Sequence, residues 1–122
     1  MKVLLGIVSD AGYAEALERT VERAGIADDD LTIAIVDKPA SDTGLPDVKE
    51  TVERVLSDAA IDAEVRLIEG DPGSQLVEIA ETEGFDRIVL GGGQTSPMGK
   101  IKIGSTAEFV LLNSHVSVLL VR

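Results

Sequence analysis

Cysteine and tryptophan are absent from this 122-residue sequence, and it contains one histidine, His115. The lack of cysteine excludes disulfides, thiolate chemistry and cysteine-based zinc sites, and a single histidine cannot form a histidine cluster. One tyrosine and two phenylalanines are the only aromatic residues, which leaves no stacking platform for single-stranded nucleic acid. The core must therefore be packed from valine, isoleucine, leucine and alanine.

Long apolar runs are also lacking. The apolar stretch at residues 1–8 is too short for a signal peptide or a membrane span, and the polar pair Ser9-Asp10 ends it. We therefore expect a cytoplasmic protein. The length and the 44% content of hydrophobic residues fit one domain spanning residues 1–122, with a core of modest size.

Basic side chains are scarce, with eleven against 22 acidic ones and a net charge of −11. This balance argues against non-specific binding to nucleic acid or to anionic membranes. Residues 1–86 carry seven basic and 21 acidic side chains, a net of −14, whereas residues 87–122 carry four basic side chains and one acidic, a net of +3. The positive part of the chain suits a small anionic ligand, and the acidity elsewhere is also typical of adaptation to high salt.

Hydrophobic periodicity alternates between two types along the chain. Continuous apolar runs such as Val3–Val8 predict strands buried on both faces, whereas apolar residues three and four positions apart predict amphipathic helices. We expect strands at 3–8, 31–36, 63–68, 87–90 and 116–121, and helices at 14–24, 48–59, from 72 onward and at 106–113. Strands that alternate with helices predict a parallel sheet covered by helices on both faces.

Several residues predict where these elements end. Gly25 is expected to end the first helix, whereas Asp71 is expected to cap the third helix and Pro72 to begin it. The proline- and glycine-containing residues 37–46 predict a loop. The strand at 63–68 alternates between polar and apolar residues, which predicts a position nearer the sheet edge.

The stretch from Gly91 to Ser105 connects the fourth predicted strand to the fourth predicted helix. Glycines at a strand end let the backbone approach a ligand, and the first turn of a helix offers free N–H groups and a positive dipole end to an anion. A phosphate site is the first hypothesis. The Walker loop does not fit, because five residues rather than four separate Gly93 from Gly99-Lys100 and isoleucine follows. A Gly-x-Gly-x-x-Gly pattern is also missing.

A different spacing is present, with Gly91, Gln94, nine residues, and then Gly104-Ser105. It resembles the nucleotide motif of the universal stress protein family, in which Gln94 takes the place of a second glycine. The resemblance covers the whole chain, including the opening strand, the Ile35-Val36-Asp37 end of the second strand, residues 81–91 and the closing strand.

That resemblance implies an α/β fold with an open five-stranded parallel sheet of order 3-2-1-4-5, similar to the adenine nucleotide alpha hydrolase-like proteins. It also implies a homodimer formed through the last strand, Val116–Val121. In ATP-binding members the nucleotide lies across the ends of strands one, two and four. The implied ligand is therefore ATP or another adenine nucleotide, with Mg²⁺ as its companion.

Position by position, the resemblance implies that Gly91, Gly104, Ser105 and Thr106 hold the phosphates and ribose, and that the backbone of Ile35 contacts adenine. The acid that ATP-binding members carry at the end of the first strand aligns with a valine here, so the neighbouring polar pair would have to replace it. No catalytic or metal-ligating residue is identified. The full candidate nucleotide site is Ser9, Asp10, Ile35, Gly91, Gly92, Gly93, Gln94, Ser96, Gly99, Lys100, Gly104, Ser105 and Thr106.

Some of these residues also have a purely structural interpretation. Ser105 followed by Glu108 has the spacing of a helix capping box, and His115 has no acid or nucleophile close to it in sequence. Two classes of function remain. One is a nucleotide-binding stress-response module that acts as a homodimer, and the other is a dimeric scaffold of the same fold that binds no ATP and acts through protein partners. Slow ATP hydrolysis is the least supported, because no general base is identifiable.

Overall fold

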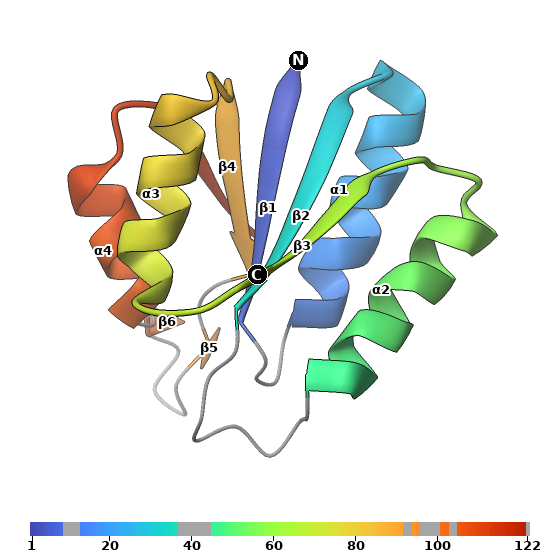
Figure 1. Ribbon diagram of the computed structural model, residues 1–122, viewed down its shortest axis with the longest axis horizontal. Coiled ribbons are helices and arrows are strands. Elements are labelled where there is room, and N and C mark those ends of the chain that lie inside the picture. The colour runs from blue at the N-terminus through green and yellow to red at the C-terminus, as the bar shows by residue number, and fades with distance from the viewer. Residues whose placement is uncertain (9–12, 37–44, 92–93, 96–100, 103–104, 122) are drawn as a thin grey trace.

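Figure 1 shows a computed structural model of the chain, which describes residues 1–8, 13–36, 45–91, 94–95, 101–102 and 105–121. Apart from the two-residue strands at 94–95 and 101–102, strands and helices alternate along these segments as the periodicity predicts. None of the described helices is long and apolar enough to cross a membrane. The elements in chain order are β1 (Lys2–Val8), α1 (Tyr13–Ala27), β2 (Asp30–Val36), α2 (Leu45–Asp58), β3 (Glu64–Ile68), α3 (Pro72–Thr82), β4 (Arg87–Gly91), β5 (Gln94–Thr95), β6 (Ile101–Lys102), α4 (Ser105–Asn113) and β7 (Ser117–Val121).

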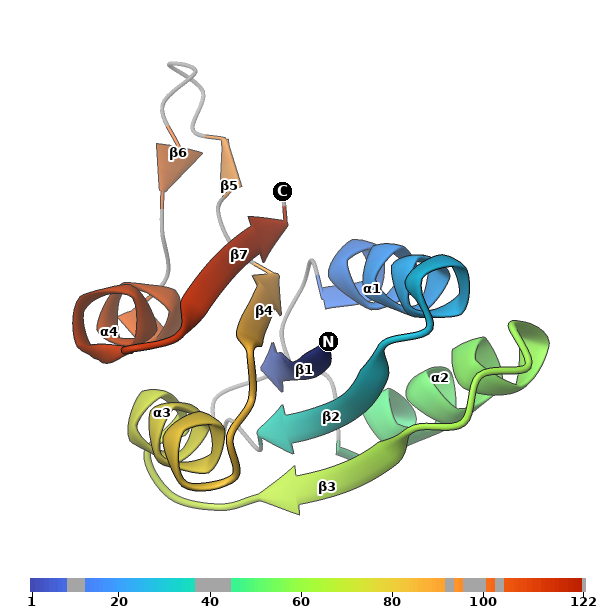
Figure 2. The same ribbon diagram turned by 90° about the horizontal axis from the view of Figure 1, so that it is seen from above.

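The main sheet has five parallel strands in the order β3-β2-β1-β4-β7, which confirms the predicted order. The central strand β1 pairs with β2 from Lys2 to Val8 and with β4 from Val3 to Gly6. Figure 2 shows α1 and α2 on one face of the twisted sheet and α3 and α4 on the other. The chain leaves β1 toward β2 on one side and reaches β4 on the other, so the strand order reverses beside β1. Ligands of such sheets bind at this point, outside the carboxyl ends of the strands.

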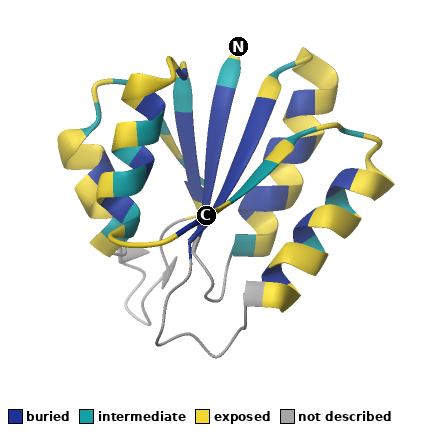
Figure 3. Cartoon of the chain, viewed as in Figure 1, coloured by how far each residue is buried: buried dark blue, intermediate teal, exposed yellow. Residues whose placement is uncertain are grey.

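Each face of the sheet has its own core. On the α1–α2 face, the sheet residues Leu5 and Ile33 pack with Val52 of α2 and are fully buried, and on the α3–α4 face Leu4 packs in the cluster that contains Leu76. β1 and β2 are therefore buried on both sides, as their continuous apolar runs predict. The colouring of Figure 3 shows the central strands as mostly buried. β3 is largely exposed or half-buried and lies at the sheet edge, which confirms its predicted position.

Two predicted helix boundaries are wrong. α1 does not end at Gly25 but continues to Ala27, and the residue with a positive φ of 56° is Asp28. The short side chain of aspartate tolerates the left-handed conformation, so this helix end does not require glycine. Similarly, α2 begins at Leu45, which places Pro46 in the first turn of the helix rather than in the preceding loop. Proline is favourable there because first-turn N–H groups have no intrahelical acceptor.

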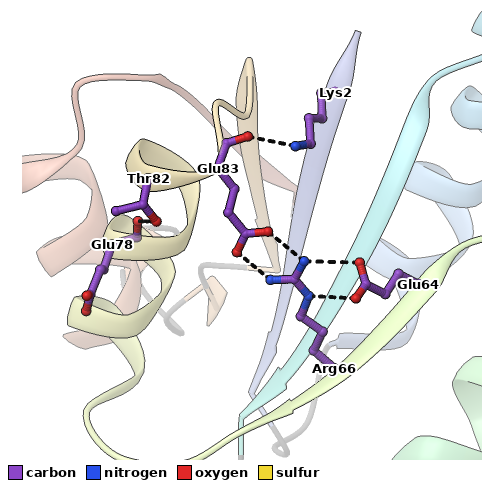
Figure 4. A network of polar contacts seen from close by, with 6 residues as sticks. All are labelled: Lys2, Glu64, Arg66, Glu78, Thr82 and Glu83. Carbon is purple, nitrogen blue, oxygen red and sulfur yellow. Dashed lines mark hydrogen bonds and ion pairs between the residues drawn. The ribbon is translucent and has the colours of Figure 1, made fainter.

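An ion-pair network joins the outer part of the sheet to the end of α3 (Figure 4). Arg66 of β3 donates to both carboxylate oxygens of Glu64 at 3.0 and 3.1 Å, and its Nη2 donates to Glu83 Oε1 at 2.7 Å. Lys2 of β1 donates from Nζ to the backbone oxygen of Glu83 at 2.7 Å. The hydrogen bond from Arg66 lowers the pKa of Glu83 below its usual range. Since these groups are largely exposed, we expect the network to orient the elements more than it stabilises them.

Candidate functional site

The carboxyl edge of the sheet brings three strand ends together. β1 ends at Val8, which is paired with Val36 at the end of β2, and β4 ends at Gly91. Neighbouring strands lie about 4.8 Å apart, so the ends of β2, β1 and β4 lie within about 10 Å across the sheet. This spacing suits one small ligand laid across the three ends.

Gly91 is the first exposed residue after a buried strand. The preceding residue, Leu90, is only 2% exposed and packs in the core on the α3–α4 face. Gly91 itself is exposed, and its Cα partner on β7 is Val121. With no side chain at this position, the backbone at the end of β4 is open to close approach by a ligand.

The first turn of α4 provides the second part of the site. Ser105 begins the helix and is exposed, Thr106 is half-buried, and Ala107 packs into the core. First-turn N–H groups lack intrahelical acceptors and carry the positive end of the helix dipole, so they favour a bound anion. The helix begins one residue earlier than expected, and the capping-box interpretation of Ser105 stays a prediction.

A glycine that sequence reasoning missed allows α4 to pack closely on α3. Gly73 lies in the first turn of α3, and a Cβ atom added to it would lie 2.7 Å from Cδ1 and 2.9 Å from Cγ of Phe109 on α4. A side chain at position 73 would therefore require Phe109 to move from its place against α3. The sequence signal is weak, because a glycine after Asp71-Pro72 is also common in ordinary turns. Gly73 supports the site indirectly, through the position of α4.

Between Gly91 and α4, the described residues form a short antiparallel ribbon that the periodicity did not predict. β5 pairs with β6 through Gln94↔Lys102 and Thr95↔Ile101. The chain that leaves β4 therefore runs beside the chain that returns to α4. The two described pairs bring residues 94–95 and 101–102 of the glycine-rich stretch side by side.

The thirteen predicted site residues are only partly described. Ile35 lies near the end of β2 with a fully buried side chain, so any contact with a ligand is left to its backbone. Gly91 ends β4, Ser105 and Thr106 begin α4, and the backbone of Gln94 belongs to β5, whereas their contact with a nucleotide stays a prediction. Eight predicted residues lie outside the described part of the chain, namely Ser9, Asp10, Gly92, Gly93, Ser96, Gly99, Lys100 and Gly104.

Two carboxyl groups with a lowered pKa have structural explanations. Asp71 accepts a hydrogen bond from the backbone N–H of Ser74 at 3.0 Å. Its pKa is lowered first by hydrogen bonding with the Ser74 side chain and second by this backbone bond. The contact confirms Asp71 as the cap of α3. The lowered pKa of Glu83 is caused chiefly by its hydrogen bond from Arg66. Neither shift indicates a general acid or base.

His115 has a partner that is distant in sequence. Its Nδ1 lies 3.0 Å from Glu81 Oε1, and its backbone N–H donates to the same oxygen at 3.3 Å. The imidazole is 88% exposed and precedes β7, at the opposite end of the sheet from Gly91. The pair therefore links α3 to the start of β7 and takes no part in the candidate site. Among the described residues no cluster of three or more acidic, histidine or cysteine side chains is arranged to hold a metal ion.

Comparisons with known proteins agree with this architecture. The universal stress protein family model matches residues 1–122. A universal stress protein of Methanocaldococcus jannaschii is 32% identical over 71 residues, and this match covers 58% of the chain and 42% of that relative, which is less than half of its length. A solved universal stress protein in complex with cAMP is 27% identical with a TM-score of 0.76, and the likeness covers 100% of this chain and 96% of that one. A structure from Archaeoglobus fulgidus in complex with dAMP has 19% identity and a TM-score of 0.69 over 100% and 98% of the two chains, which shows likeness of fold.

Proposed function

The chain belongs to the universal stress protein family, and we propose that it binds an adenine nucleotide, ATP in the first place, at the carboxyl edge of its sheet. It acts in the cytoplasm as a stress-response module in the form of a homodimer. Two solved members of the family contain cAMP and dAMP, which supports adenine nucleotides as the ligand class.

One observation carries the proposal. The exposed end of β4 at Gly91 and the exposed first turn of α4 at Ser105 are the two ends of one connection, and the pairing of Gln94 with Lys102 draws the two halves of that connection together. A phosphate group held there accepts hydrogen bonds from the backbone N–H groups at the start of α4. Because the strand ends in glycine, no side chain at position 91 blocks its approach. The same edge ends β1 and β2, where the rest of a nucleotide has room to lie.

Each predicted residue keeps its proposed role. The backbone N–H groups of Gly91, Gly104, Ser105 and Thr106 hold phosphate and ribose together with the hydroxyls of Ser105 and Thr106. The backbone of Ile35 faces the base. The polar pair Ser9-Asp10 replaces the missing acid at the end of the first strand. Mg²⁺ would be held by the phosphates of the nucleotide and by water, which are its usual ligands at nucleotide sites.

The decisive experiment is release of bound nucleotide. Purified protein is extracted with acid, and the extract is analysed by mass spectrometry for adenine nucleotides. We expect an adenine nucleotide from the wild type and less from Gly104→Ala and Ser105→Ala. The matched control Ser57→Ala changes an exposed serine near the end of α2 and should retain the wild-type amount.

Addition of ATP provides an independent test. It should raise the melting temperature of the wild type more than that of Ser105→Ala, because a ligand that binds only the folded state stabilises it. No release of nucleotide and no thermal shift at any salt concentration would reject the binding proposal. The alternative, a dimeric scaffold that binds no ATP, would then hold. In such a protein no phosphate has to approach position 94, so Gln94 can stand in place of a glycine.

The homodimer is a separate proposal. β7 pairs with β4 on one side and ends the main sheet on the other, where the described residues provide no further strand. An apolar edge strand with open backbone groups favours pairing with a second copy. Sedimentation at micromolar concentration should give the mass of a dimer, and a monomer mass would contradict the proposal.

A further inference from the structure

The α1 face of the sheet leaves one strand without a helix over it. α1 packs beside β4 and α2 lies farther along the sheet, so β7 extends past the covered part of this face (Figure 2). Leu119 of β7 points to this face and is 42% exposed. A cavity of about 570 Å³ opens between α1 and β7, and among the described residues that line it none belongs to the predicted nucleotide site.

The floor of this cavity is apolar. It is formed by Val3, Leu31 and Val89 of the central strands together with Leu119 and Val121 of β7. The first three are almost completely buried and cannot move away from the sheet. Its volume falls within the range of about 300–1,000 Å³ that is typical of small-molecule sites.

The rim of the cavity is basic, in a chain whose net charge is −11. Arg19 and Arg23 are one turn apart on α1, and Arg87 stands at the start of β4. One carboxylate, that of Asp29, also lines the cavity. Among the described residues that line the hollow, three guanidinium groups stand against one carboxylate, which gives it a local positive charge.

The ion pairs among the described residues occupy only some of the hydrogen-bond donors of these three arginines. Arg19 contacts Glu15 at 2.9 Å on the exposed surface of α1. Arg23 uses Nε for its 3.5 Å contact with Asp29, which leaves the remaining donors of its guanidinium outside that contact. Arg87 has no ion pair with any residue in the described ranges.

We propose that this cavity is a second ligand site, which binds a small amphipathic anion such as a medium-chain carboxylate. The head group is held by Arg87 with Arg19 and Arg23, and the aliphatic chain covers Leu119 and Val89. Charge complementarity selects this occupant, because a neutral apolar partner would leave the guanidinium groups beside it unsatisfied. The head-group end of this cavity is separate from the nucleotide site, because Arg87 stands at the start of β4, whereas Gly91 ends that strand. The cavity reaches the carboxyl edge of the sheet at Val121, the partner of Gly91 on β7.

The test is calorimetric titration of the full chain with octanoate. We expect saturable binding of one octanoate per chain, unchanged by saturating ATP, and much weaker binding of octanamide and of acetate. Arg87→Gln should weaken octanoate binding by about tenfold, as expected for loss of a charged hydrogen bond. The matched control Arg54→Gln removes an exposed arginine on α2 that does not line the cavity, and should bind like the wild type.

Three results would overturn the proposal. They are equal binding of octanamide and octanoate, equal losses in Arg87→Gln and Arg54→Gln, and a change of sedimenting mass on addition of octanoate, which would indicate that a second copy of the chain occupies the cavity. If far-UV circular dichroism shows that Arg87→Gln is misfolded, Arg19→Gln replaces it. Arg19 is 63% exposed on α1, so its loss should weaken octanoate binding without unfolding the chain.

Discussion

The tight packing around Gly6 gives a prediction whose magnitude follows from the structure. Gly6 lies in the centre of β1, and a Cβ atom added there would lie 2.8 Å from Cδ1 of Leu76 and 2.8 Å from Cδ2 of Leu90. Both leucines are almost completely buried, so neither can move aside without disturbing the core. Gly6→Ala should therefore lower the free energy of unfolding by about 1–3 kcal/mol, the usual cost of overpacking a core.

Urea denaturation followed by circular dichroism measures this effect. With a slope of about 2 kcal/mol per molar urea, a loss of about 2 kcal/mol lowers the midpoint by about 1 M. Gly25→Ala is the matched control, since Gly25 is an exposed residue inside α1 and an added Cβ would meet only Cδ1 of Ile61, at 3.2 Å. Removal of glycine from a helix interior is favourable by up to about 1 kcal/mol, so the control should not lose stability.

A double-mutant cycle tests the proposed cause. Leu76→Ala alone should cost about 2–5 kcal/mol, because it leaves a cavity beside Gly6. In the Gly6→Ala background the added methyl group occupies part of that cavity, so the second substitution should cost less by at least about 0.5 kcal/mol. Additive losses, or a Gly6→Ala variant as stable as the wild type, would show that steric contact with Leu76 is not the reason for glycine at this position.

Two further predictions concern polar contacts. The folded pKa of Glu83 is lowered by Arg66, so the stability that this contact contributes is present above the usual carboxyl pKa and is lost as pH falls through the folded pKa. The urea midpoint of Glu83→Gln should therefore lie below that of the wild type at pH 7 and meet it in acid, and parallel curves would contradict the assignment. Asp71→Ala should lower the urea midpoint at pH 7 because it removes the cap of α3, whereas Asp71→Ser should retain most of it. Equal midpoints for the two variants would exclude a capping role.

The sequence predicts the elements well where packing is periodic. The continuous runs of β1 and β2 predict burial on both faces, and Asp71-Pro72 predicts the start of α3. The strand order rests on the family resemblance, because periodicity does not determine which strands pair. β5 and β6 were missed because two-residue strands show no period. Their pairing depends on a contact across the glycine-rich stretch rather than on local pattern.

A residue of the candidate site can be predicted from the sequence only when its place at the end of a strand or the start of a helix gives it its role. The places of Gly91 at a strand end and of Ser105 at a helix start could be predicted because such boundaries are recognised locally. Gly73 was missed because its importance depends on Phe109, which belongs to another helix. The pairing of His115 with Glu81 was missed for the same reason, since Glu81 comes from α3 and no acid lies close to His115 in sequence.

Basic residues of the last third of the chain are close in sequence but lie at different places in the fold. In sequence, Arg87 belongs to the same positive segment as Lys102, and both could serve the glycine-rich stretch. The structure places Arg87 at the start of β4, four residues before Gly91 and therefore about 13 Å from the strand end, where it lines the cavity beside α1. Lys102 lies in β6, next to the candidate nucleotide site.

This separation allows the two proposed sites to be tested against each other. Arg87→Gln should weaken octanoate binding and leave the amount of retained nucleotide unchanged, whereas Ser105→Ala should do the opposite. The reason is geometric, because one residue lies at the start of β4 and the other lies beyond its end. Circular dichroism must first show that each variant is folded. If either substitution then lowers both octanoate binding and nucleotide retention, the two sites are coupled, and the assignment of the charges to separate ligands is wrong.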